Sequence, residues 1–319
     1  YLGSRSDYTT GIVLEKGKGK WSVGHPGGSP DVPAVVGSVV VSGSRGGDLN
    51  ATEAYTYPDI PAEFTPTPTG DQGTTVHVDP APEKEVWTTS LDVGVRSSVS
   101  YADGTAVVGT DDGLAAVALD SGRVRWRAPR DGPVESTPAI ADGVAVAGAK
   151  DGSVAAHALA DGTEQWTTAT GDRVVSSPAV RDGAAYVGSD DGSLYAFELA
   201  DGTTRWEFET GGPVVSSPAA TPAVVVVGSA DGTVYAVDSA TGERRWSFET
   251  DGPVYSSPAV ADETVYVGSR DGHLYALGLT DGRERWRFAA RNWVDSSPAV
   301  GFGTVFVTDQ GGNLYALVD

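Results

Sequence analysis

The chain has 319 residues, and 43 acidic against 22 basic side chains give a formal net charge of −21. The absence of cysteine excludes disulfides, zinc–thiolate sites and thiol nucleophiles together. The charge disfavours nucleic acid and anionic lipid as partners, because phosphate groups are bound by basic surfaces, and no apolar run has the length of a transmembrane segment.

The N-terminal region contains three candidate strand segments. Tyr8–Leu14 and Gly17–Val23 have the mutual spacing of a third and a fourth strand in the repeat described below, and the second of them holds Trp21. Pro33–Gly47 aligns with Pro258–Gly272, far along the chain, which predicts that both begin the same kind of unit. The alignment leaves Tyr8–Leu14 without an assigned place.

A Pro- and Thr-rich stretch, 58–83, interrupts the first unit. Trp21 and Trp87 are 66 residues apart, whereas the later tryptophans recur about every 40 residues. The excess falls on a segment with prolines at 58, 61, 66, 68, 80 and 82, and proline cannot donate to a strand ladder. We therefore predict that 58–83 is an insertion, and that Glu85–Leu91 is the strand that follows it.

From Trp87 onward the sequence repeats with a period of about 40 residues. Tryptophan recurs at 126, 166, 206, 246 and 286, and Ser-Ser-Pro-Ala recurs at 176–179, 216–219, 256–259 and 296–299, with Ser-Thr-Pro-Ala at 136–139. Two glycine turns lie between each Pro-Ala and the next tryptophan. The first turn holds Asp112-Gly113, Asp151-Gly152, Asp191-Gly192, Asp231-Gly232 and Asp271-Gly272, and the second ends at Gly122, Gly162, Gly202, Gly242 and Gly282.

One repeat is predicted to contain four short strands, at Ser257–Ala261, Thr264–Ser269, His273–Leu279 and Glu284–Phe288. The second and third are rich in β-branched and aromatic residues, as strands prefer. The Asp-Gly pair between them predicts a type I′ hairpin, which requires positive φ. Four strands in about 40 residues are typical of a β-propeller blade.

Seven tryptophan-bearing strands predict a seven-bladed all-β propeller that occupies residues 1–319 as a single domain. The blade formed by 296–319 lacks a fourth strand, and we predict that the strand around Trp21 supplies it. Such closure removes a free sheet edge. Eight blades, or six blades with a long N-terminal arm, remain as alternatives, because Tyr8–Leu14 has no place in this count.

The segment Ala236–Trp246 reads A-V-D-S-A-T-G-E-R-R-W, which resembles the tryptophan-docking repeat of quinoprotein-type propellers, A-x-D-x-x-T-G-x-x-x-W. The glycine and tryptophan recur in every regular blade, whereas the aspartate is mostly replaced. The resemblance implies that each tryptophan packs between neighbouring blades, against the glycine turn and a small residue on the third strand. The small residue would be the alanine ten positions before each tryptophan, at 116, 156, 196, 236 and 276.

The resemblance implies two branches of function. Quinoprotein alcohol dehydrogenases use pyrroloquinoline quinone and Ca²⁺ in eight blades, and they usually carry a vicinal disulfide over the cofactor. The other branch is non-catalytic and includes the propeller lipoprotein of the outer-membrane barrel-assembly machinery, which binds proteins. This chain has roughly half the usual dehydrogenase length and no cysteine. The non-catalytic branch is therefore the expected one, with no cofactor.

Other chemical motifs are weak. The Asp-Gly pairs lack the D-x-D-x-D-G spacing of a calcium loop, and hairpin turns explain them. The four histidines, at 25, 77, 157 and 273, share no ligand spacing. The serines and threonines have no evident histidine and aspartate partners for a hydrolase triad. No catalytic residue and no metal ligand is predicted.

Positions that differ between repeats are the candidate binding residues, because the shared positions build the blade. One variable position precedes the Pro-Ala motif, and it holds Arg96, Glu135, Val175, Val215, Tyr255 and Asp295. Another follows the second strand, and it holds Arg45, Asp111, Lys150, Asp190, Ala230, Arg270 and Gln310. Both should face the channel mouth at one end of the propeller.

The loop before the last blade departs most from the repeat, because Arg291-Asn292-Trp293 replaces Asp251-Gly252-Pro253. An exposed tryptophan beside arginine is a frequent binding anchor, although simple packing of Trp293 on its neighbour is the alternative. The predicted partner-binding residues are Arg291, Asn292, Trp293, Asp295, Tyr255, Arg270 and Gln310. The insertion 58–83 is the next candidate.

The sequence therefore predicts a non-enzymatic scaffold that binds a protein, peptide or glycan at one rim of the channel. The alternatives are a quinone- and Ca²⁺-dependent oxidoreductase and the ligand-sensing portion of a larger membrane-attached protein. With five lysines and a large acidic excess, the composition is typical of an extreme halophile. A high net charge also keeps proteins soluble and monomeric. We expect a monomer that is extracellular or attached to the cell surface; an ordinary acidic secreted protein is the alternative source.

Overall fold

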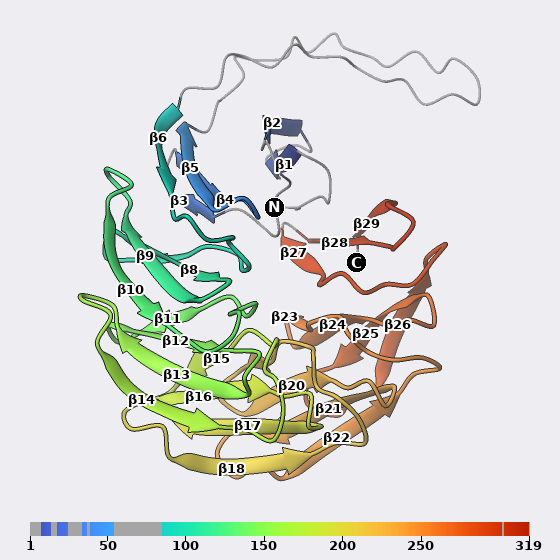
Figure 1. The fold of residues 1–319 in the computed structure, drawn as a ribbon. Coiled ribbons are helices and arrows are strands. Elements are labelled where there is room, and N and C mark those ends of the chain that lie inside the picture. The colour runs from blue at the N-terminus through green and yellow to red at the C-terminus, as the bar shows by residue number, and fades with distance from the viewer. Residues whose placement is uncertain are drawn as a thin grey trace, which may run out of the picture.

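A computed structural model describes residues 8–13, 18–24, 34–36, 39–53, 85–301 and 303–318. Every regular element among these residues is a β-strand. Consecutive strands pair antiparallel, and their sheets follow one another around a ring (Figure 1). In the described part of the chain, no helix is long and apolar enough to cross a membrane.

Six sheets of the described chain have four strands each. The first three comprise β3 (Ala34–Val36), β4 (Val39–Gly43), β5 (Asp48–Glu53) and β6 (Glu85–Ser90); β7 (Ser100–Ala102), β8 (Thr105–Thr110), β9 (Gly113–Ala118) and β10 (Val124–Pro129); and β11 (Ala139–Ala141), β12 (Val144–Gly148), β13 (Ser153–Ala158) and β14 (Glu164–Ala169).

The other three comprise β15 (Ala179–Arg181), β16 (Ala184–Gly188), β17 (Ser193–Glu198) and β18 (Thr204–Glu209); β19 (Ala219–Ala220), β20 (Val224–Gly228), β21 (Thr233–Asp238) and β22 (Arg244–Glu249); and β23 (Ala259–Ala261), β24 (Thr264–Gly268), β25 (His273–Gly278) and β26 (Glu284–Ala289). A further sheet has the three strands β27 (Ala299–Gly301), β28 (Thr304–Thr308) and β29 (Leu314–Val318). These seven sheets fit seven blades, which confirms the propeller fold and its antiparallel four-stranded unit.

The N-terminal strands pair differently from the prediction. The strand around Trp21 is β2 (Lys18–Gly24), and it is hydrogen-bonded to β1 (Tyr8–Val13), with Gly11 opposite Trp21. It is not paired with β29, which ends a sheet of three described strands. The predicted closure of the last blade is therefore wrong in its pairing, because the short connection favours a local hairpin.

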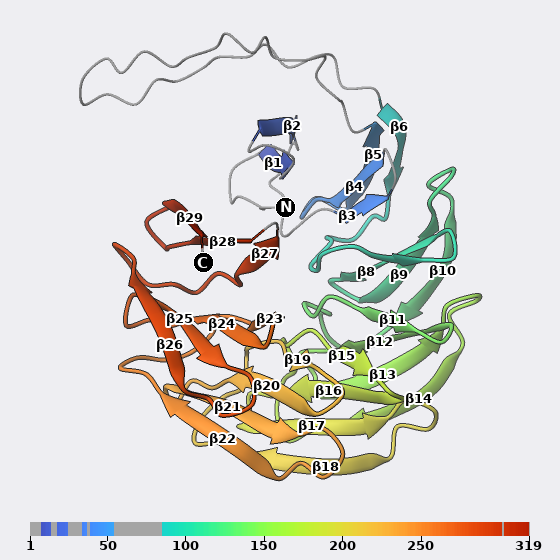
Figure 2. The same ribbon diagram turned by 180° about the vertical axis from the view of Figure 1, so that it is seen from behind.

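The β1–β2 hairpin also gives Tyr8–Leu14 its missing place. Figures 1 and 2 show this hairpin in the opening of the ring, between the sheet that begins with β3 and the sheet that begins with β27. The predicted insertion 58–83 lies outside the described residues.

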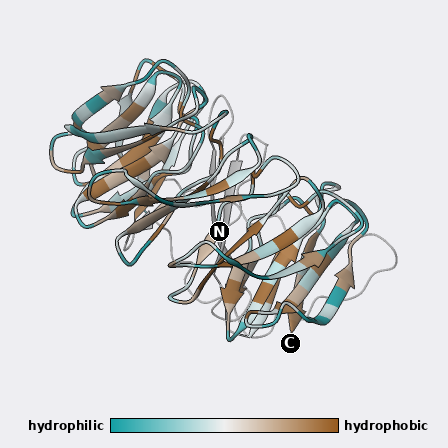
Figure 3. Ribbon diagram, turned by 90° about the horizontal axis from the view of Figure 1, so that it is seen from below, coloured by the Kyte–Doolittle hydropathy of each residue, from teal (hydrophilic) through white to brown (hydrophobic). Residues whose placement is uncertain are grey.

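The core lies between the blades. The two middle strands of a blade are buried almost throughout, as in β8 and β9, whereas the outer strand β10 alternates. Middle strands have a neighbouring blade on each face, so both faces are apolar, while the outer strand has one face in solvent. Figure 3 shows hydrophobic residues concentrated on the strands and hydrophilic residues in the loops.

The Ser-Ser-Pro-Ala motif connects the blades. The first serine ties its loop to the second strand: Ser176 Oγ accepts from the Gly188 N–H at 3.1 Å. The second serine reaches the preceding blade: Ser217 Oγ accepts from the Ser177 N–H at 2.9 Å, and the same bond recurs one repeat later. The motif recurs because both hydroxyls have structural partners.

The turn between the second and third strands is not of the predicted type I′. In the Asp191-Gly192 turn only the glycine has positive φ (95°), and the Asp191 carboxylate accepts from the Ser193 N–H, so this is not a type I′ turn. Positive φ at both central residues occurs instead between the first and second strands, as in Asp182-Gly183 (49° and 71°).

Glu263 provides a test of this turn geometry. Asp262 and Glu263 have φ of 46° and 62°, where three other blades place Asp-Gly. A left-handed conformation costs an L-residue about 1–2 kcal/mol. Glycine avoids this cost, but it loses about 0.5–1 kcal/mol more than other residues in backbone entropy on folding. We expect Glu263→Gly to raise the free energy of unfolding by roughly 0.5–1 kcal/mol, measured by urea denaturation. Gly183→Ala, the matched control, should lower it; stabilisation by both would contradict the argument.

The recurring tryptophans contact the next blade. Trp166 Nε1 donates to the Leu199 carbonyl at 2.8 Å, and a Cβ added to Gly202 would lie 2.5 Å from the Trp166 ring. Ala156 lies opposite Trp166 on the neighbouring strand of the same sheet. The tryptophans at 126, 206 and 246 make the same donation to the carbonyl 33 residues later, and Trp87 donates to the carbonyl 32 residues later.

Candidate partner-binding site at the channel mouth

Five of the seven predicted binding residues come together at the junction of the sixth and seventh blades. The carboxylate of Asp295 accepts two parallel bonds from Arg270, Nε to Oδ1 and Nη2 to Oδ2, each at 3.0 Å. Gln310 Nε2 donates to the same carboxylate at 2.9 Å. We call the set Tyr255, Arg270, Trp293, Asp295 and Gln310 the aromatic patch.

Two rings hold the guanidinium of Arg270. Its central carbon lies 4.3 Å from the centroid of the Tyr255 ring and 5.0 Å from that of Trp293. Arginine between aromatic faces gains cation–π attraction. The hydrogen bond to Asp295 also raises the pKa of Arg270 above its usual value, so its charge is permanent. Trp293 remains 51% exposed, and its outer face is therefore open to solvent.

Arg291 and Asn292 are exposed and lie in the loop beside the aromatic patch. The Arg291 N–H donates to the Tyr315 hydroxyl at 3.1 Å, and the Asn292 amide oxygen accepts from the Trp293 N–H at 2.8 Å. These bonds fix the loop that presents Trp293. The two residues are therefore neighbours of the patch.

Most residues at the two variable positions of the other blades line a common hollow of about 460 Å³. We call it the mouth cavity, and its lining residues are Arg45, Arg96, Glu135, Lys150, Arg173, Val175, Asp190 and Val215. The sequence argument missed one of these, Arg173. The sequence signal that could have identified Arg173 is that it replaces a proline of the repeat, as Trp293 does.

Ion pairs connect the charged residues of the mouth cavity. Arg96 Nε lies 2.5 Å from Asp111 Oδ1, and Lys150 Nζ lies 2.7 Å from Glu135 Oε1. Arg173 Nε donates to Asp190 Oδ2, and this bond raises the pKa of Arg173. The pairs place cationic groups at fixed positions around the opening.

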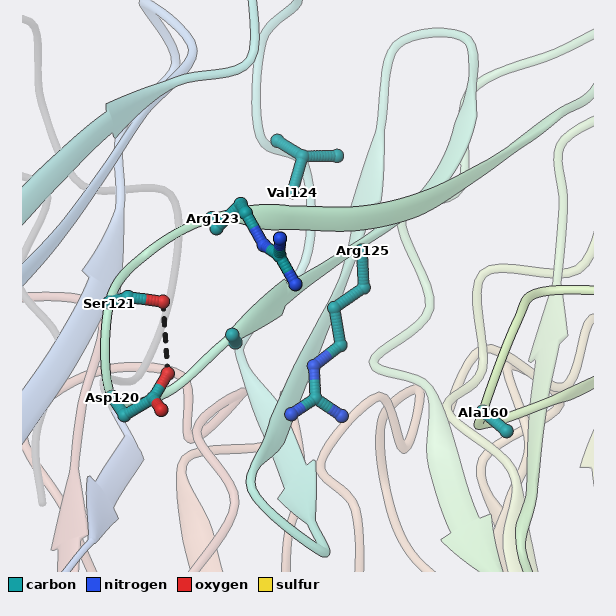
Figure 4. Close-up of a pocket in the computed structure, with 7 residues that line it drawn as sticks. Asp120, Ser121, Arg123, Val124, Arg125 and Ala160 are labelled. Atoms are coloured by element: carbon teal, nitrogen blue, oxygen red, sulfur yellow. Dashed lines mark hydrogen bonds between the residues drawn. The ribbon is translucent and has the colours of Figure 1, made fainter.

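A second hollow, of about 620 Å³, lies at the turn before β10 (Figure 4). Asp120 and Ser121 hydrogen-bond to each other there, and the side chain of Arg125 extends toward the space below β10. Arg125 donates to Thr105 Oγ1 at 2.6 Å, and Arg285 makes the corresponding bond to Thr264. Because this arginine recurs and is bonded within its blade, blade construction accounts for the hollow.

The histidines of the described strands have partners within the blades. His157 is buried, its Nδ1 lies 3.1 Å from the Gly162 carbonyl, and its ring stacks on Trp126. Burial lowers the pKa of His157. Across the described ranges, no group of three or more histidine, aspartate or glutamate side chains is arranged to hold a metal ion.

Antiparallel blades arranged around a polar mouth define a repeat protein of the β-propeller class. Residues 72–315 match the family model described as the beta-propeller of the beta-alanine-activating enzyme, and the chain therefore belongs to this propeller family. No curated protein matches the chain in sequence.

Solved structures share the fold at low sequence identity. The computationally designed protein Ika8 has a TM-score of 0.82 at 16% identity, over 99% of this chain and 92% of that chain. BamB from Moraxella catarrhalis has a TM-score of 0.78 at 20% identity, over 99% of this chain and 90% of that chain. Sqt1 from Saccharomyces cerevisiae has a TM-score of 0.78 at 12% identity, over 99% of this chain and 92% of that chain. At these identities the likeness shows the fold alone.

Proposed function

We propose that the chain is a non-enzymatic propeller scaffold that binds a protein, peptide or glycan partner at the rim of its channel. The observation that carries the proposal is the aromatic patch, in which a half-exposed Trp293 packs against Arg270, and Arg270 is paired with Asp295. An aromatic ring whose position is fixed before binding loses little conformational entropy on contact, and tryptophan and arginine are enriched among residues that dominate binding energy.

The chemistry of the patch favours binding over catalysis. Among these five described residues, the carboxylate of Asp295 is engaged by Arg270 and Gln310, so it is not placed as a base beside a nucleophile. Guanidinium and amide donors next to an aromatic face suit a polar or anionic group on the partner. The family is named for the propeller of an enzyme; our proposal for this chain is a binding role.

The test is a pull-down with the double variant Trp293→Ala with Arg291→Ala, from native lysate at high salt. Loss of specific partners is expected, because the exposed ring and the adjacent cation are both removed. The matched control is Val86→Ala with Arg283→Ala, which removes an exposed apolar side chain and an exposed arginine elsewhere. If the patch variant retains the wild-type partner profile with its fold intact, the rim is not the site.

Further proposals concern context and domain structure. We propose an extracellular or surface-attached monomer from a halophile, in which residues 1–319 form one propeller domain and 58–83 is an insertion. The acidic composition supports the first part, and the repeat supports the second. We also propose that the tryptophan contacts between blades are the docking contacts of quinoprotein-type repeats. Their recurring bond to the next blade supports this.

A further inference from the structure

The mouth cavity has a local charge opposite to that of the whole protein. Its lining carries four cationic side chains and two carboxylates, while the chain has a net charge of −21. Basic residues are about half as frequent as acidic ones in this sequence, 22 against 43. A cationic cluster in such a chain indicates attraction of an anionic group.

Part of the donor capacity of this cluster is free within the described residues. Arg96 and Arg173 each engage a carboxylate through Nε, which leaves their terminal N–H groups available. Arg45 is exposed, and no carboxylate in the described part of the chain pairs with it. Arginine forks bind carboxylates through two parallel hydrogen bonds.

Asp190 requires a hydrogen-bond donor from the ligand, whereas the cationic side chains require an acceptor. Its side chain is only 7% exposed, and its Oδ1 is buried without a hydrogen-bond partner. Only its Oδ2 is satisfied, by Arg173. A buried polar atom without a partner is unfavourable, so a ligand that supplies an N–H or O–H donor here would be favoured over a simple anion.

An acidic peptide satisfies both requirements. Its carboxylates can meet Arg45, Arg96 and Lys150, and a backbone N–H can donate to Asp190 Oδ1. Val175 and Val215 offer apolar contact within the same cavity of about 460 Å³. We propose that the mouth cavity binds an acidic peptide segment. The inference rests on the proposed function and deepens it, because it names the chemistry of the partner at the same mouth.

The test uses a fluorescein-labelled hexaglutamate peptide as the probe, titrated against the full chain and followed by fluorescence anisotropy. Salt at about 1 M screens the general repulsion beyond ~3 Å. We expect saturable binding, and a loss of about tenfold in affinity for Arg45→Gln, the size of one charge-assisted hydrogen bond. Arg283→Gln, which changes the net charge equally at an exposed turn, should leave affinity unchanged.

Asp190→Asn distinguishes specific recognition from simple attraction. If charge alone acted, removing this carboxylate would strengthen binding of the acidic probe. We expect weaker binding, because asparagine has a single acceptor oxygen, which cannot serve both Arg173 and a donor of the ligand. Circular dichroism melting checks that each variant folds.

Four outcomes would overturn the inference: no saturable binding, equal losses in Arg45→Gln and Arg283→Gln, tighter binding by Asp190→Asn, or competition by free glutamate as effective as by unlabelled peptide. The last would indicate a small-molecule site. Failure here is distinguishable from failure of the rim proposal, because the pull-down uses variants of Trp293 and Arg291 outside the mouth cavity.

Discussion

Replacing Trp166 by alanine is expected to lower the free energy of unfolding by about 3–5 kcal/mol, the range for removal of a buried tryptophan. The side chain is 7% exposed and packs against Gly202 of the next blade, and its N–H donates to the Leu199 carbonyl. The variant would create a cavity at the junction of two blades and would leave that carbonyl without its donor. Urea denaturation measures the change.

Two further variants separate the contributions. Trp166→Phe keeps most of the ring and removes the N–H, so the loss should fall to roughly 0.5–1.5 kcal/mol for the bond plus a small packing term. Trp286→Ala is the matched control, because Trp286 has the same place in its blade but is only partly buried. We expect a smaller loss there. Equal losses at Trp166 and Trp286 would contradict a dependence of the loss on burial of the ring.

The melting temperature is expected to rise when KCl is increased from about 0.1 M to about 2 M, because the Debye length falls from about 10 Å to below 3 Å over this range. With a net charge of −21, repulsion between acidic side chains opposes the compact state and weakens as salt screens it. Differential scanning calorimetry at several salt concentrations measures the slope.

A control variant isolates the charge effect from general effects of salt on apolar burial. Neutralising exposed carboxylates at turns, such as Asp161→Asn and Asp201→Asn, should leave the fold intact and reduce the slope. Their carboxylates accept local hydrogen bonds from the threonine two residues later, which asparagine can still accept. A melting temperature of the parent chain that stays constant or falls as KCl is added would contradict the argument.

The sequence predicted the blade and the location of its variable positions. The strand bounds 264–269 and 273–279 agree with β24 and β25 to within one residue, and seven of the thirteen residues at the two variable positions line one cavity. Each blade contacts mainly its neighbours, so a period near 40 residues carries the information for the whole ring. The resemblance to quinoprotein-type repeats implied an alanine beside each recurring tryptophan, and Ala156 and Ala196 do lie opposite Trp166 and Trp206.

The tertiary structure decided what repetition does not specify. The pairing of β2 with β1 was decided in the N-terminal segment, where a local hairpin competes with a distant strand edge. The bidentate contact of Arg270 with Asp295, and the buried, unpartnered oxygen of Asp190, depend on which side chains of different blades meet at one opening. The sequence by itself determined the repeating four-stranded blade, because a blade is formed by residues close together in the chain. Charge pairing at the mouth was decided only by the tertiary structure, because it joins side chains of different blades that are remote in sequence.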